Sequence, residues 1–361
     1  MSTIPNDPIR ISRNPGKPDM FRIRAFGLTD PGRVYEANED AFFVSDQQGL
    51  FIVSDGMGGA RAGALASSMT VHALPVQVSA EHLALKIKGP IENYKVIPDG
   101  LIRAIGFVND LLLDKTRGYP EVKGLGATVV ACLHTGNGVF ILAHLGDSRA
   151  YLLRNGHLER LTEDHTVAEM LFQAGRISRR RLLHHPSKHI LTRHIGKEDC
   201  PSADTAVLLL NPGDRILLCT DGLTNMLKER EIGTILLETK NREETCRLLI
   251  GRANEAGGCD NITAVIMDVE DLHLQNNYRQ KRVRVRRKIG HSVQNTVYHR
   301  ERQAGGTIER FWPDQSLRRI KNHLTGCPKS LSNVMDRALA LEPKDRYQSD
   351  WEFLEAFREA L

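Results

Sequence analysis

Four aspartates stand at the edges of apolar segments in this chain. LFIVSD ends on Asp55, VFILAHLGD on Asp147 and RILLCTD on Asp221, while Asp260 precedes the apolar run ITAVIMDV by two residues. Each acid taken alone could simply form a turn, since Asp-Gly is a common turn dipeptide. Adjacent strands would bring such ends close together, however, and clustered carboxylates repel one another unless cations neutralise them. The pattern predicts a metal site.

The candidate ligands around these strand ends all offer oxygen. They are Asp55, Asp147, Asp221, Asp260, the triplet Asn38–Glu39–Asp40 and a backbone carbonyl at Gly56. Oxygen ligands without histidine or cysteine favour Mg²⁺ or Mn²⁺ over zinc or copper. Several acids at one edge suggest more than one ion, and two ions roughly 3.5–4 Å apart are a common solution for phosphoester hydrolysis. That hydrolysis is the leading chemistry.

Composition sets the broad class. A hydrophobic content of 41% with 26% charged residues is typical of a globular protein with a packed core. The net charge of +5, from 49 basic and 44 acidic side chains, is too small to indicate nucleic acid as a partner. Six cysteines without a CxxC pair, together with the lack of a signal-like or membrane-length apolar segment, predict a cytoplasmic protein with no membrane partner.

Periodicity predicts an α+β fold. Hairpin turns are expected at HTGNGV and RNGH, and helices over 62–74, 100–113, 167–174 and 241–256. The composition becomes basic after the run that ends at Val269, in DLHLQNNYRQKRVRVRRK. We therefore expect a flexible leader over 1–19, a main domain over 20–270, and a small, mainly helical segment with a basic linker over 271–361.

Seven motifs in this order carry a family resemblance. They are NEDAFFV, FIVSDGMGG, GATVVA, LGDSRAYLLRNGHLERLTEDH, LTRHIG, PGDRILLCTDGL and GGCDNITAVI, all between residues 21 and 269. In these motifs the chain resembles the metal-dependent serine/threonine phosphatases of the PPM or type 2C class, in their bacterial form. The resemblance implies a four-layer αββα sandwich, in which an antiparallel β-sandwich is flanked by helix pairs and holds metal ions at one end.

The resemblance also implies a core metal site. Asp55 would bridge two Mn²⁺ or Mg²⁺ ions, the Gly56 carbonyl would bind one ion, and Asp221 and Asp260 would bind the other. A hydroxide bridging the two ions would attack phosphoserine or phosphothreonine. Asp55, Asp221 and Asp260 are thus also the implied catalytic residues.

Three further acids have implied roles outside that core. Glu39 and Asp40 would hold metal-bound waters. Asp147, together with Asp221, resembles the pair that binds a third, weaker ion in bacterial members, which makes Asp147 a residue that affects rate or conformation.

Two positions depart from the family pattern. Tyr35 stands where many members have an arginine that pairs with the substrate phosphate, and Arg33, two residues earlier and on the same face if this segment is a strand, is the candidate substitute. Arg33 is therefore also a candidate catalytic residue, and Arg33 and Tyr35 are the candidate substrate-binding residues. The alternative is a solvated arginine in a turn. Met57 stands where animal-type members have a histidine proposed as the general acid, so that a metal-bound or bulk water must protonate the leaving group.

Other polar residues are weaker candidates. His184 and His185 lie in GRISRRRLLHHPSKH, which matches a flap region of bacterial members and is expected to be a solvated loop, with substrate docking through its arginines as the alternative. Ser54 and Ser148 have no histidine at motif spacing, so neither is expected to be a nucleophile.

The C-terminal segment has a second resemblance. VMDRALALEPKDRYQSDWEFLEAF resembles the last helices of a eukaryotic-like protein kinase domain, and the stretch from Tyr278 to Tyr298 resembles its first strands and glycine-rich loop after decay. No catalytic loop or DFG motif follows, which excludes kinase catalysis. The segment is expected to be a kinase remnant that docks a partner kinase or its substrate, or else a helical appendage of the main domain.

Two functions compete at this stage. The first is a phosphatase acting on phosphorylated proteins, with a serine/threonine kinase or its substrates as partners and a monomeric state. The second is a catalytically weak phosphoprotein-binding scaffold that docks a kinase. The first is favoured because every metal carboxylate is present, whereas a chain without catalysis would be expected to lose some of these mutually repelling acids.

Overall fold

The computed structural model describes residues 21–87, 96–117, 124–135, 138–198 and 202–271. All of them belong to the first of two compact units of the chain, residues 1–290. The expected leader over 1–19 and the kinase-like stretches lie outside the described residues, so the predicted domain boundaries stay predictions.

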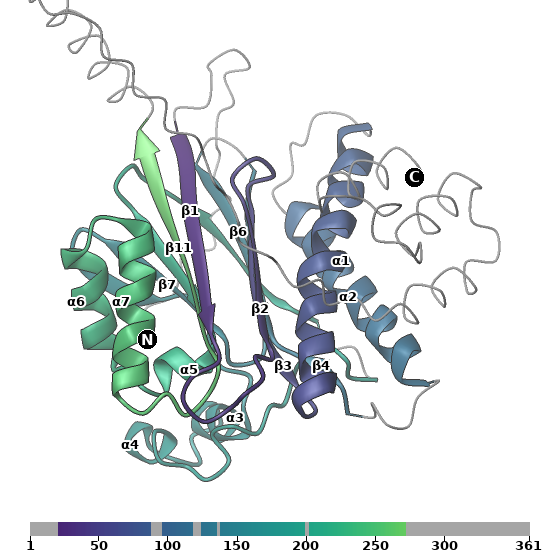
Figure 1. Ribbon diagram of the computed structural model, residues 1–361. Coiled ribbons are helices and arrows are strands. Elements are labelled where there is room, and N and C mark those ends of the chain that lie inside the picture. The colour runs from purple at the N-terminus through teal and green to yellow at the C-terminus, as the bar shows by residue number, and fades with distance from the viewer. Residues whose placement is uncertain (1–20, 88–95, 118–123, 136–137, 199–201, 272–361) are drawn as a thin grey trace, which may run out of the picture. The chain divides into compact units, whose positions relative to one another are not determined.

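Two antiparallel sheets form the centre of this unit (Figure 1). The first sheet contains, in spatial order, β1 (Phe21–Asp30), β11 (Ile262–Asp271), β10 (Arg215–Cys219), β7 (Arg149–Arg154) and β8 (His157–Arg160). The second contains β2 (Asp40–Ser45), β3 (Leu50–Met57), β5 (Val129–His134), β6 (Val139–Leu145) and β9 (Asp204–Leu209), and the short β4 (Gly126–Ala127) pairs with β3.

Helices cover the outer faces of both sheets. The long helices α1 (Ala60–Ile87) and α2 (Val96–Arg117) pack on the second sheet, and α6 (Glu229–Glu238) and α7 (Arg242–Glu255) pack on the first. Three shorter helices lie in connections: α3 (Val167–Gln173), α4 (Arg179–Leu182) and α5 (Asp221–Thr224).

Three hydrophobic clusters separate the four layers. On β3, Leu50 and Ile52 belong to the cluster under α1 and α2, whereas Phe51 and Val53 belong to the cluster between the sheets. A third cluster, which includes Tyr151, lies between the first sheet and α6 and α7. Because β3 is buried on both faces, it reads as a continuous apolar run rather than an alternating one. The predicted four-layer α+β sandwich is confirmed.

Four helices and one turn agree with the local predictions. The four predicted helices correspond to α1, α2, α3 and α7, although α1 extends well past residue 74. RNGH forms the β7–β8 turn with Asn155 at φ 52° and Gly156 at φ 79°, a conformation with two positive φ angles that favours glycine and asparagine. Part of HTGNGV lies outside the described residues, but the strands on either side of it pair. Helices α4, α5 and α6 were not predicted.

Among the helices that the structure describes, none combines the length and the apolar character needed to span a membrane.

Candidate metal centre

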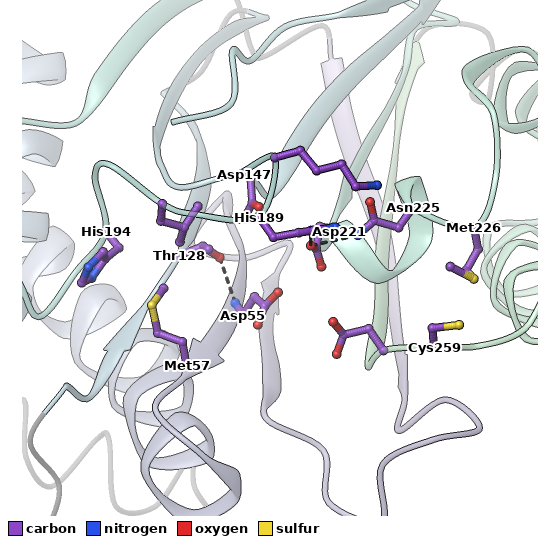
Figure 2. A pocket seen from close by; sticks show the side chains of 13 residues that line it. Asp55, Met57, Thr128, Asp147, His189, His194, Asp221, Asn225, Met226 and Cys259 are labelled. Carbon is purple, nitrogen blue, oxygen red and sulfur yellow. Dashed lines mark hydrogen bonds and ion pairs between the residues drawn. The ribbon is translucent and has the colours of Figure 1, made fainter. Parts of the chain in front are cut away.

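Four aspartates from four separate elements line one cavity of about 540 Å³. Asp55 lies on β3, and Asp147 lies in the turn between β6 and β7. Asp221 begins α5 directly after β10, and Asp260 lies two residues before β11. Figure 2 shows Asp55, Asp147 and Asp221 around the same space. The structure therefore brings together the aspartates that the sequence places at strand edges.

Asp40 adds a fifth carboxylate beneath this cavity. It is the register partner of Asp55 in the β2–β3 pair, and its side chain is buried. Its Oδ2 accepts hydrogen bonds from Thr220 Oγ1 at 2.8 Å and Thr263 Oγ1 at 2.7 Å. Because the Thr263 hydroxyl has one proton and gives it to Asp40, its 2.7 Å contact with Thr29 Oγ1 must be one in which Thr29 donates. One carboxylate oxygen is thus held by a directed chain of hydroxyls.

Burial and mutual repulsion disfavour the charged form of these acids. Burial raises the pKa of Asp40 to about 7, with the charges of Asp221 and Asp260 adding to the rise and the two threonine hydroxyls opposing it. Burial also raises the pKa of Asp55 and of Asp147 well above the usual range, and Asp221 adds to both shifts. Such a cluster is costly without positive charge nearby.

Glu39, the residue before Asp40, packs against the start of α1. A Cβ built on Gly63 would lie 1.7 Å from Glu39 Oε2, so only glycine at this position leaves room for the carboxylate. Gly56 is equally confined, because its Cβ would lie 2.0 Å from the Gly63 carbonyl oxygen. Burial raises the pKa of Glu39, and Asp260 adds to it. The two glycines allow β3, Glu39 and α1 to approach closely.

The donor set fits divalent metal ions. Two buried carboxylate oxygens in the described part of the chain, Asp40 Oδ1 and Asp221 Oδ1, have no hydrogen-bond partner. Buried acceptors normally have a hydrogen-bond partner, so these two oxygens remain able to bind a positively charged ligand. Among the described residues, no three of these carboxylates have oxygens that all lie within 4.8 Å of one another. Oxygen ligands spread around a wider cavity suit more than one hard cation.

Basic residues from the segment between α4 and β9 also line the cavity. They include Lys188, His189 and His194. His189 Nδ1 lies 3.7 Å from Asp221 Oδ2, and its side chain is half exposed. His184 and His185, the histidines of this stretch that were weighed as candidates from the sequence, do not line the cavity. Met57 does line it, and it carries no proton to donate.

The two predicted substrate-binding residues lie elsewhere. Arg33 and Tyr35 are exposed, and neither lines the cavity. The Arg33 backbone N–H donates to the Gly258 carbonyl at 2.7 Å, which places residue 33 beside the loop that carries Asp260. The role of Arg33 in holding phosphate, and that of Tyr35, stay predictions.

Several supporting residues were missed from sequence. Asn261 Oδ1 accepts from the Glu39 amide at 2.7 Å, and Thr128 Oγ1 accepts from the Asp55 amide at 2.9 Å, a contact drawn in Figure 2. Thr220 and Asn261 are each next to a predicted ligand in sequence, which was an available signal. Thr128 had none, because it reaches Asp55 across 73 residues. Ser54 Oγ is buried and donates to the Thr128 carbonyl, in line with its expected lack of a nucleophilic role.

Comparisons with known proteins agree on one family. The family model described as protein phosphatase 2C matches residues 33–253. The serine/threonine phosphatase stp of Listeria welshimeri is 39% identical over 243 residues, which cover 66% of this chain and 93% of that protein. The crystal structure of the Mycobacterium tuberculosis phosphatase PstP/Ppp aligns with a TM-score of 0.59 and 31% identity, over 69% of this chain and 99% of that one. A PstP catalytic domain in complex with two manganese ions aligns with a TM-score of 0.58 and 30% identity, over 70% and 100%.

Proposed function

Since this chain belongs to the protein phosphatase 2C family, we propose that the acidic cavity at the strand ends is the active site of a phosphatase whose catalytic domain spans residues 20–270. The chain is a metal-dependent serine/threonine phosphatase, and it hydrolyses phosphate esters in phosphorylated proteins. The single observation that supports placing the site here is that Asp55, Asp147, Asp221 and Asp260 come from four separate elements to one cavity.

The carboxylates divide into three groups in this proposal. Asp55 and the Gly56 carbonyl, together with Asp221 and Asp260, hold two ions, which are Mn²⁺ or Mg²⁺. Glu39 and Asp40 stand behind them and accept hydrogen bonds from water. Asp147 and Asp221 hold a third ion more weakly. The two manganese ions named for the related PstP structure support the core pair.

The bound ions supply positive charge that stabilises the phosphoryl group and lowers the pKa of a nucleophilic water. The chain's own residues orient the ligands: Thr220 and Thr263 fix one oxygen of Asp40, and Asn261 fixes the Glu39 backbone. Since Met57 has no acidic proton, the proton that the leaving serine or threonine alkoxide needs comes from water. Lys188 and His189 face the incoming phosphate, and Arg33 assists from the Gly258 loop.

The scaffold alternative is not favoured, because each predicted carboxylate ligand is present and lies at or beside this cavity.

For the C-terminal segment we propose a docking role: residues 271–361 are a kinase remnant that docks a partner serine/threonine kinase or its substrate. The protein acts as a monomer in the cytoplasm, which the free, buried thiols of Cys132, Cys219 and Cys246 suit.

Metal binding tests the site without depending on turnover. Titration calorimetry of the chain with MnCl₂ should detect two tight sites, and Asp55→Asn should lose at least one of them. Asp46→Asn, an exposed aspartate that pairs with Arg24 far from the cavity, should bind as the native chain does. Equal manganese binding by the Asp55→Asn variant and the native chain would contradict the assignment.

A further inference from the structure

Four polar side chains form a cluster beside the turn that carries Asp147. This His165 cluster consists of His144 on β6, His165 before α3, Arg193 and Asp204 at the start of β9. The two imidazole rings stack with centroids 4.6 Å apart and planes 16° from parallel. Although it is buried at its centre, none of the four residues belongs to the acidic cavity.

His165 is tied to the turn by both its backbone and its side chain. Its backbone N–H donates to the Gly146 carbonyl at 3.0 Å, and its Nδ1 accepts from the Gly146 N–H at 3.2 Å. Its own carbonyl accepts from the Thr192 N–H at 2.8 Å. His165 thus joins the residue next to Asp147 to the segment that brings Lys188 and His189 to the cavity.

These contacts fix the tautomer of the ring. A backbone N–H is always a donor, so Nδ1 of His165 must be the unprotonated nitrogen. The proton of the neutral ring is then on Nε2, which lies 3.1 Å from Asp204 Oδ2 and 2.9 Å from Arg193 Nη1. A guanidinium cannot accept, so this proton is directed to Asp204. Burial and the stacked His144 ring lower the pKa of His165 to about 4, so the ring stays neutral at physiological pH.

The turn itself requires glycine at position 146. Gly146 has φ +102°, and a Cβ there would lie 2.5 Å from Thr128 Cγ2. On the far side of the turn, Ser148 Oγ lies 2.7 Å from Thr128 Oγ1, the atom that accepts the Asp55 amide. Asp147 is therefore held from both sides, by His165 through Gly146 and by Thr128 through Ser148.

A second metal site is a poorer explanation of the cluster. His144, His165 and Asp204 do offer ligand atoms within 4.8 Å of one another. Arg193, however, already places its guanidinium there, with Nη1 2.9 Å from His165 Nε2 and Nη2 2.7 Å from Asp204 Oδ1. A divalent cation would have to displace that fixed charge, and His165 would have to give up the Nε2 proton that Asp204 accepts.

We propose that His165 is a positioning residue for the phosphatase reaction: through Nδ1 it holds the Gly146–Asp147 turn in the conformation that directs Asp147 at the metal cavity. The inference rests on the proposed function, because it assigns a role within that same site. It also links the turn to the Lys188 segment through Thr192.

Two isosteric substitutions separate the two ends of the ring. His165→Asn keeps an amide oxygen near the position of Nδ1, so it can still accept from Gly146, but it loses the contact with Asp204. His165→Gln places its amide near Nε2, so it keeps Asp204 and loses Gly146. His157→Gln, on the exposed β8 hairpin, is the matched control. Each variant is assayed for manganese-dependent hydrolysis of a phosphothreonine peptide and for calorimetric manganese binding.

The proposal predicts a difference between the two variants. His165→Gln should raise the manganese concentration for half-maximal activity by about 10-fold or more and weaken the lowest-affinity calorimetric site to match, since residues behind a ligand typically contribute 10- to 100-fold. His165→Asn should stay within about 3-fold of the native chain, as should His157→Gln. Equal losses in the Asn and Gln variants, or no loss in either, would overturn the positioning role.

If His165→Gln does not fold, the half-exposed Asp204 provides the same comparison. An imidazole accepts from Gly146 only while its proton stays on Nε2, a condition that the amide of His165→Asn does not have. Asp204→Asn keeps an acceptor for that proton and should preserve the manganese requirement, while Asp204→Ala removes it and should raise the requirement at least about 3-fold; equal requirements would contradict the proposal. A native chain that neither binds manganese nor releases phosphate would refute the proposed function itself. A native chain that is active, with variants that have the same manganese requirement, would refute only the role of His165.

Discussion

At the scale of single residues, the site includes a buried acid, Asp40, whose hydrogen-bond partners are neutral hydroxyls. Asp40 has one oxygen held by Thr220 and Thr263 and one without a hydrogen bond. Hydrogen bonds to a charged group contribute about 1.5–3 kcal/mol, more than those between neutral groups. The hydroxyls therefore favour the ionised form that burial opposes.

Thr263→Val tests this role with almost no change in shape. The variant removes the donor to Asp40 and leaves Thr29 without its acceptor, so the carboxylate should be protonated at higher pH. We expect kcat to fall about 10-fold at pH 7 and to recover partly at pH 8.5. Thr234→Val, at an exposed position of α6, should leave the pH profile of kcat unchanged. An unshifted profile in Thr263→Val would show that the hydroxyl does not control Asp40.

The phosphate contact is also a residue-scale question. Lys188 lines the cavity and Arg33 does not. Lys188→Met should therefore raise KM for a phosphothreonine peptide by about 3- to 10-fold with a smaller change in kcat, and Arg33→Met should raise it less. Steady-state kinetics on the two variants decide between them. A larger KM effect at Arg33 would instead identify Arg33, the candidate substitute named from the sequence, as the phosphate partner.

At the scale of elements, the start of α1 must let Glu39 and β3 come close together. In Gly63→Ala the new Cβ would collide with Glu39 Oε2 and with the Gly56 carbonyl oxygen, which lies 2.7 Å away. We expect the free energy of unfolding to fall by about 1–3 kcal/mol, as in other overpacked sites, and activity to fall with it. Urea denaturation measures the first effect.

Gly251→Ala is the control for that experiment. Gly251 lies within α7, and an added Cβ there would have nothing within 4 Å. Replacing an unconstrained helical glycine by alanine should stabilise the protein by about 0.5–1 kcal/mol. If Gly63→Ala changed the free energy of unfolding in the same way as Gly251→Ala, the close approach of Glu39 to α1 would not be required.

Elements with long periodic signals could be predicted from the sequence, and those fixed by tertiary contacts could not. The windows that predicted α1 and α7 contain many apolar positions, whereas α4 and α5 have four residues each and are too short to show a period. The aspartates were identifiable because each interrupts or borders an apolar strand. Thr128 and the His165 cluster were not, because hydrogen bonds between residues far apart in sequence place them. Lys188 and His189 were passed over since a basic stretch is usually a solvated loop.

At the scale of the whole molecule, the acids around the cavity make the stability of the fold depend on pH and on metal binding. The folded-state pKa of Asp40 is about 7 against an ordinary value of 3.8, so between these values the folded chain binds more protons than the unfolded chain. Stability then falls as pH rises through this range. Asp55, Asp147, Asp260 and Glu39 are shifted in the same direction. His165, with its lowered pKa, acts oppositely, because its neutral burial costs stability below pH 6.5.

Manganese should offset the loss of stability that these acids cause as pH rises. Because the ions bind deprotonated carboxylates, their affinity increases with pH, and binding to the folded chain stabilises it. The rise in Tm on adding 1 mM MnCl₂ to chelator-treated protein should therefore be larger at pH 8 than at pH 5.5. Differential scanning calorimetry at the two pH values checks this expectation. A rise independent of pH would mean that the raised carboxylates are not the ligands.

Phosphate release from a phosphothreonine peptide tests the central claim most directly. The native chain and Asp55→Ala are each assayed with manganese, with magnesium and with chelator, after circular dichroism shows that both are folded. We predict manganese-dependent release by the native chain, none with chelator, and none by Asp55→Ala under any condition. Release that persists in chelator, or near-native release by folded Asp55→Ala, would contradict the assignment of this acidic edge as the catalytic metal centre.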